Sequence, residues 1–93
     1  MSQRRFSSVW DAIEDTPEQA ANMKLRSALM MALKDHITRT GMSQAQAAKL
    51  FGVRQPRISD LMRGKIDLFG LDALVNMATA AGLRVEMRVL EAA

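Results

Sequence analysis

The stretch that most constrains the fold covers residues 43–65 and reads SQAQAAKLFGVRQPRISDLMRGK. Ser43 and Gln46 have the spacing of a capping box, in which each side chain bonds the other residue's backbone N–H, so a helix is predicted to begin at Ser43. Gly52 suits the left-handed conformation that ends a helix and allows a tight turn. Pro56 stands in the first turn of a second helix, where a missing N–H costs nothing. The stretch therefore predicts two short helices joined by a tight turn.

Apolar and polar residues separate along the second of these helices. Ile58, Leu61 and Met62 recur at three- and four-residue spacing, so they are predicted to face inward. The exposed start of the helix carries four polar side chains, namely Arg54, Gln55, Arg57 and Ser59. An ordinary helical hairpin without a ligand accounts for the apolar spacing but not for this polar group. We therefore predict that residues 43–64 form a helix-turn-helix. Such a motif presents the start of its second helix to base edges of duplex DNA, so these four residues are the predicted base contacts.

Positive charge is centred on the same stretch. The chain of 93 residues has 13 Lys and Arg against 10 Asp and Glu, a net charge of +3. Residues 43–66 carry +4 and residues 23–42 carry +3, whereas residues 1–22 and 67–93 carry −2 each. Phosphate contacts supply most non-specific affinity for DNA, so this distribution favours DNA binding over a merely solvated basic face. The residues predicted to contact phosphate are Ser43, Lys49, Arg63 and Lys65.

Helices are also predicted on both sides of this stretch. Thr16 and Pro17 are a strong helix start, and the long helix that follows is predicted to end at Gly41. Another helix is predicted from about Leu71 to Gly82, and a short helical turn is predicted over residues 8–13. These elements make five helices in one all-α domain that covers residues 1–93.

Residues 83–90 show a different pattern, in which apolar and charged side chains alternate. Four apolar residues fall on one side, namely Leu83, Val85, Met87 and Val89. This is the pattern of a half-buried strand, and it is the only strand candidate in the chain. A lone strand leaves a row of unpaired backbone groups. The simplest remedy is a second copy of the chain, so we predict a homodimer in which the two strands pair across a two-fold axis.

Composition and spacing argue against several other classes of protein. The chain has no cysteine, and its one histidine, His36, has no nucleophile tied to it. The acidic residues 11–15 lack the spacing of metal ligands, so we predict no enzyme, no metal and no cofactor. No apolar run approaches the roughly 20 residues that span a bilayer, and the opening residues lack a secretory segment. A cytoplasmic protein without a membrane partner is predicted.

The N-terminal segment, residues 1–15, leaves two interpretations open. Val9, Trp10 and Ile13 share an apolar side of the predicted turn. They either fold back on the long helix as additional core or bind a partner protein. The acidic residues beside them suit a basic partner.

Over nearly its full length the sequence resembles the Xre/Cro-type helix-turn-helix regulators, which have a lambda-repressor-like fold, and among them the HigA-like antitoxins. The helix-turn-helix stretch carries the resemblance to the superfamily, and the segments SVWDAIED, TPEQAANMKLRSALMMAL and LDALVNMATAAGLRVEMRV carry the rest. The resemblance implies a homodimer that binds operator DNA and represses its own operon. It also implies, as an alternative main role, an antitoxin that neutralises a small basic ribonuclease toxin of the RelE-like fold.

Carried over by position, the resemblance places Gln44 against a phosphate at the start of the first helix. It also implies that the four predicted base-contacting residues face the major groove. Pro56 departs from the polar residue that is usual at its position, so one base contact is missing.

Overall fold

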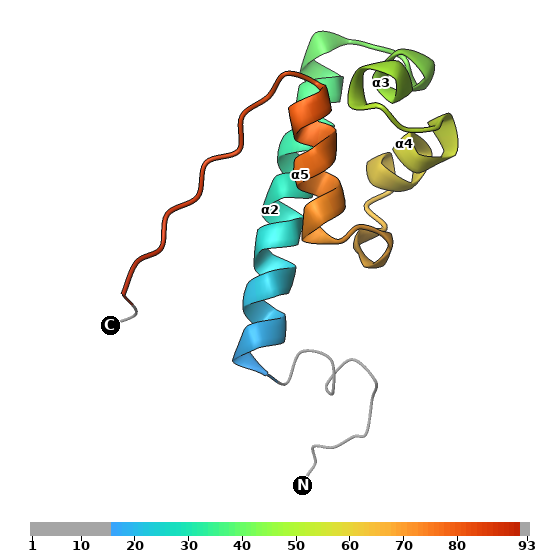
Figure 1. Cartoon of the computed structure of the whole chain (residues 1–93). Coiled ribbons are helices and arrows are strands. Elements are labelled where there is room, and N and C mark those ends of the chain that lie inside the picture. The colour runs from blue at the N-terminus through green and yellow to red at the C-terminus, as the bar shows by residue number, and fades with distance from the viewer. Residues whose placement is uncertain (1–15, 92–93) are drawn as a thin grey trace, which may run out of the picture.

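A computed structural model describes residues 16–91 of the chain. This part holds four α-helices and one 3-10 turn, which are α2 (Pro17–Thr40), α3 (Gln44–Phe51), α4 (Gln55–Met62), η1 (Ile66–Leu68) and α5 (Leu71–Ala80). Helices α2 and α5 lie side by side, and α3 and α4 pack together on one flank of this pair (Figure 1). The fold is therefore all-helical in the described residues, with the two short helices held against the two longer ones.

The helix ends confirm the local predictions. The backbone N–H of Gln46 donates to Ser43 Oγ at 3.1 Å, and the N–H of Ser43 donates to Gln46 Oε1 at 2.8 Å, so the capping box is formed. Thr16 Oγ1 accepts from the N–H of Gln19 at 3.1 Å and caps α2. Gly41 and Gly52 follow α2 and α3 with φ of 68° and 70°. These contacts act within a few residues, which is why the sequence alone located them.

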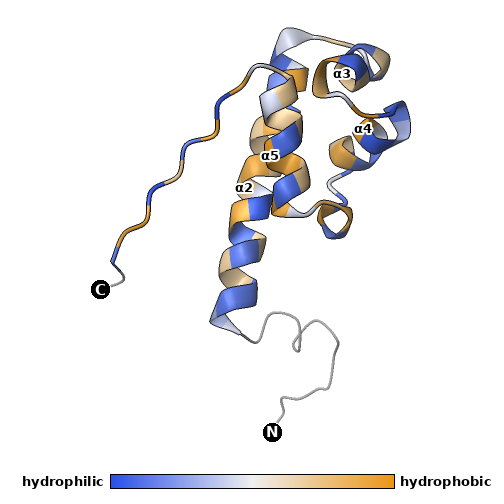
Figure 2. Ribbon diagram, in the orientation of Figure 1, coloured by the Kyte–Doolittle hydropathy of each residue, from blue (hydrophilic) through white to orange (hydrophobic). Residues whose placement is uncertain are grey.

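One hydrophobic core joins all four helices and Phe69, which lies in the connection before α5. Its buried members are Met30, Leu33, Ile37, Ala47, Ala48, Phe51, Ile58, Leu61, Phe69, Leu74, Met77 and Ala78. Helix α2 contributes only from its second half, and residues 17–29 contain no buried residue. The first half of α2 accordingly extends past the short helices and carries apolar patches that the core does not cover (Figure 2).

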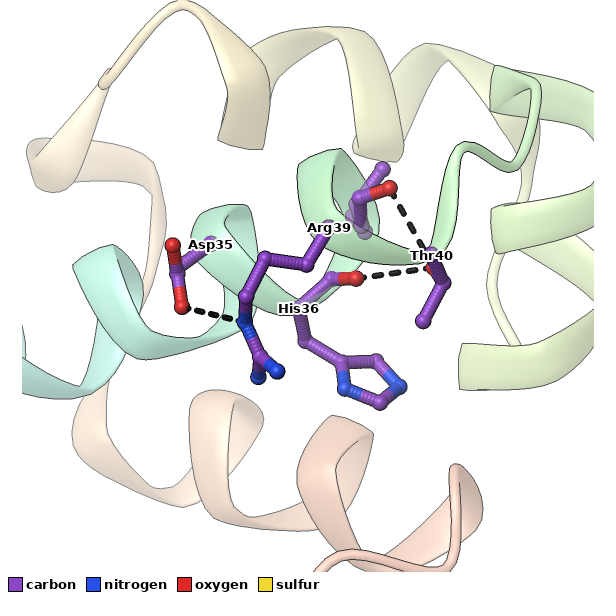
Figure 3. Close-up of polar contacts among 5 residues, drawn as sticks. Asp35, His36, Arg39 and Thr40 are labelled. Atoms are coloured by element: carbon purple, nitrogen blue, oxygen red, sulfur yellow. Dashed lines mark hydrogen bonds and ion pairs between the residues drawn. The ribbon is translucent and has the colours of Figure 1, made fainter.

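The last turns of α2 are tied together by local polar contacts (Figure 3). Arg39 Nε donates to Asp35 Oδ2 at 2.8 Å, and Thr40 Oγ1 donates to the carbonyl of His36 at 2.8 Å. The imidazole of His36 meets the ring of Phe51 edge-on, with ring centroids 6.4 Å apart. His36 is thus a residue at the edge of the core.

The prediction of a β-strand over residues 83–90 is not supported. The described residues contain no strand, and the segment after α5 continues without regular structure on the α2 side, away from α3 and α4 (Figure 1). Leu83 packs against the core and its N–H donates to the carbonyl of Ala78 at 2.9 Å. A strand requires a neighbour to receive its backbone hydrogen bonds, and residues 84–90 have none among the residues that the structure describes. Four helices are described where five were predicted, and the turn predicted over 8–13 lies outside the described residues.

The turn between α3 and α4 provides a test of backbone strain. A Cβ on Gly52 would lie 3.6 Å from that of Ala80, which is ordinary contact, but the φ of +70° is left-handed. We expect Gly52→Ala to lower the free energy of unfolding by about 1–2 kcal/mol through strain alone. Gly70→Ser is the control, because Gly70 has a φ of −75° and caps α5, where serine is a good cap. Urea denaturation measures both, and an equal loss in the two variants would contradict this account.

Candidate nucleic-acid interface

Helix α4 has one buried side and one polar side. Ile58 and Leu61 are fully buried, and they hold α4 against the core. Gln55 and Ser59 are four residues apart, so they are neighbours on the helix surface, and Gln55 is exposed while Ser59 is half-buried. Arg54 is the N-cap of α4, it is exposed, and its side chain makes no capping hydrogen bond. The start of α4 therefore presents polar side chains outward from a rigid support.

The starts of α3 and α4 meet at an open surface hollow. We call this feature the polar hollow, and it is lined by Gln44, Gln55, Pro56 and Ser59. Two amides and one hydroxyl offer both donors and acceptors here. Gln44, which the resemblance placed against phosphate, thus lies beside two of the predicted base contacts. The tight turn at Gly52 brings these residues together from two helices.

Arg57 is placed apart from the polar hollow. It is two positions beyond Gln55, which is about 200° round the helix. Its Nη1 donates to the carbonyl of Leu68 at 2.7 Å, and its Cζ lies 4.0 Å from the centroid of the buried Phe69 ring. The guanidinium, predicted to contact bases, instead joins α4 to the segment before α5 in this structure.

These contacts predict a structural role that stability measurements can test. We expect Arg57→Ala to lower the free energy of unfolding by about 1–2 kcal/mol, because a charged hydrogen bond and a cation–π contact are lost. Arg54→Ala is the matched control, since that side chain makes no capping bond, and it is expected to change stability by less than about 0.5 kcal/mol. Thermal or urea denaturation of both variants decides this, and equal stabilities would refute the role of Arg57.

Three of the predicted phosphate contacts lie at the ends of α3 and α4. Ser43 caps α3, and its hydroxyl still has a proton to donate while its oxygen accepts from Gln46. Arg63 is the residue that ends α4, and Lys65 follows it with Nζ 3.7 Å from Asp60 Oδ1. Cationic or hydrogen-bonding groups therefore flank the polar hollow at the start of α3 and beyond the end of α4.

The positions of two further lysines, Lys49 and Lys34, differ from those expected from the sequence. Lys49 is exposed, but it lies five residues after Gln44, about 140° round α3, so it faces away from the polar hollow. Lys34, on α2, lies outside the helix-turn-helix stretch. A Cβ on Gly64 would lie 3.8 Å from Lys34 Nζ, which places this ammonium group at the end of α4 near Arg63. No local pattern signals this contact, because it joins segments far apart in the sequence.

The other predicted interaction residues lie elsewhere. Val9, Trp10 and Ile13 are outside the described residues. Leu83 is partly buried, whereas Val85, Met87 and Val89 are exposed, Val89 to 90%. Within residues 16–91, no group of three or more His, Asp or Glu side chains could hold a metal ion. No helix of that region has the length and apolar character needed to cross a membrane.

Comparisons with known proteins agree with this geometry. A family described as "Helix-turn-helix domain" matches residues 12–90, which include every described helix. A solved structure named "Putative XRE Family Transcriptional Regulator" has 30% sequence identity and a TM-score of 0.71 to this chain. The match covers 78% of this chain and 82% of that one. None of the curated proteins matches the sequence.

Proposed function

The chain belongs to the helix-turn-helix domain family, of the XRE type, and we propose that it is a transcriptional regulator that binds duplex DNA. The observation that carries the proposal is the polar hollow at the exposed start of α4, a helix whose opposite side is buried. A helix supported in this way can enter a major groove with its first residues against base edges. The net charge of +4 on residues 43–66 supplies the attraction to phosphate.

The side chains of the polar hollow suit direct reading of bases. The Gln55 amide can pair with adenine at N6 and N7, and the Arg54 guanidinium with guanine at O6 and N7. Ser59 can donate to or accept from either base, and the apolar ring of Pro56 can contact a thymine methyl group. Arg57 contributes indirectly in this proposal, because it holds α4 in place through Phe69.

Phosphate contacts on both sides of the hollow would set the orientation of α4. At one side, Ser43 and Gln44 stand at the start of α3, where helix N–H groups also favour an anion. At the other, Arg63 and Lys65 stand beyond α4, and Lys34 joins them from α2. Lys49, on the far side of α3, is proposed to add only to the long-range field.

The proposed regulator is a homodimer that pairs through residues 83–90. In the described chain, the backbone of residues 84–91 makes no hydrogen bond to another backbone segment, and Met87 and Val89 are exposed. Pairing with the same segment of a second copy would satisfy the backbone groups and cover these side chains. Two recognition helices would then be available for two half-sites.

The proposal is tested by selecting bound duplexes from a random pool and by footprinting the protein on the region upstream of its own gene. We expect enrichment of one sequence with two related half-sites, and protection upstream of the gene if the protein represses its own operon. Binding to all duplexes with equal affinity would refute sequence-specific regulation.

A narrower role as an antitoxin is supported only by the resemblance of the sequence segments given above. It predicts a short reading frame for a basic, RelE-like protein beside this gene, and copurification of the two products. DNA binding without such a neighbour would leave a regulator that acts alone.

A further inference from the structure

An apolar groove lies on the side of the molecule opposite α3 and α4. It has a volume of about 400 Å³ and runs between α2, α5 and residues 84–88. We call it the apolar groove, and its apolar lining includes Leu25, Ala28, Leu29, Leu71, Val75 and Val85. Figure 1 shows the segment after α5 running beside α2, away from the two short helices. The groove therefore takes no part in the proposed interface with DNA.

We propose that residues 8–15 of the same chain dock in the apolar groove, with the Trp10 ring against Leu25 and Ala28. This goes beyond the proposed function and does not depend on it. Leu25 is 47% exposed in the described residues, although it lies on a helix that borders the core. A large aromatic side chain would bury the apolar surface that Leu25 leaves in water.

The connection between the two parts permits this docking. The rise of α2 places Leu25 about 13 Å from Thr16, where the N-terminal segment joins the helix. Trp10 lies six residues before Thr16, and six extended residues span about 20 Å. Trp10 can thus turn back along α2 and reach the middle of the groove without help from a second chain.

The charges of the two parts are complementary. Arg84 and Arg88 line the groove, with Glu86 between them and 3.1 Å from Arg84. Three carboxylates belong to the segment that would enter, namely Asp11, Glu14 and Asp15. Opposite charge at the rim favours this occupant over another apolar segment without acidic residues.

A tethered segment also has an advantage over a second copy. A short linker gives it an effective concentration in the millimolar range, well above that of a second chain in dilute solution. A protein that binds Val9, Trp10 and Ile13 would have to displace this contact, so the groove would compete with such a partner.

Fluorescence of the full chain tests the proposal, because Trp10 is the only tryptophan and the chain has no tyrosine. We expect blue-shifted emission and severalfold weaker quenching by acrylamide than for free N-acetyltryptophanamide. Both signals should be independent of protein concentration. Leu25→Gln should shift the emission to the red and restore quenching. Met31→Gln is the matched control, because Met31 is on the same helix and 68% exposed but does not line the groove.

Three results would overturn the proposal. The first is a wild-type Trp10 that is quenched like the free amide. The second is a protected Trp10 that Leu25→Gln and Ala28→Gln leave protected while circular dichroism shows the helices intact. The third is protection that vanishes on dilution, because the occupant would then come from a second copy.

Discussion

Gln55→Ala is expected to remove most of the preference for the selected operator over random duplex while the fold remains intact. Gln55 lies in the polar hollow beside Gln44 and Ser59, on an exposed part of α4. A bidentate contact between an amide and a base is worth about 1–3 kcal/mol of discrimination, or roughly 5- to 150-fold in the ratio of affinities. Gel-shift titrations on both duplexes measure this ratio.

Two control variants separate base reading from other effects. Arg57→Ala should lower stability but reduce the ratio of affinities far less than Gln55→Ala does, because its guanidinium is held by Leu68 and Phe69 and supports α4 only indirectly. Lys65→Ala should weaken binding to both duplexes alike and reduce the slope of affinity against salt by about 0.9 for the lost phosphate contact. If Arg57→Ala abolishes the preference and Gln55→Ala does not, the assignment of the base-reading side of α4 is wrong.

Deletion of residues 84–93 is expected to produce a monomer with greatly reduced operator affinity. The dimer would place two recognition helices about 34 Å apart, in successive major grooves, whereas a monomer has one half-site and half of the phosphate contacts. Sedimentation of the wild type and the truncated chain at micromolar concentration, followed by gel shift, measures both effects.

The deletion also removes one wall of the apolar groove, so a point variant that leaves the groove lining unchanged is needed as a second test of the dimer. Val89→Asp should weaken the dimer, because Val89 is exposed and does not line the groove. Leu90→Asp alters the adjacent residue on the other side of the alternation, also outside the groove lining, and should leave the dimer intact. A wild-type monomer, or a truncated chain that stays a tight dimer, would refute pairing through residues 83–90.

The predictions from sequence succeeded where the determining contacts are local. The capping pair Ser43 and Gln46 and the left-handed Gly52 define the helix-turn-helix within ten residues of chain, and the structure contains each of them. The i,i+4 spacing of Gln55 and Ser59 also holds them on one side of α4. The same spacing rule separates Arg57 from them, although the polar character of all these residues had grouped them together.

The sequence by itself determined the four helices of the described residues, the residues that cap α2 and α3, and the polar start of α4. These properties depend on caps, turn residues and periodicity, which act over one or two turns of chain. Only the tertiary structure decided that Arg57 lies over Phe69, that Lys34 reaches the end of α4, and that the backbone of residues 84–90 has no hydrogen-bonding partner among residues 16–91. Each of these depends on how separate helices pack, because a side chain finds its distant partner only when the core between them has been formed.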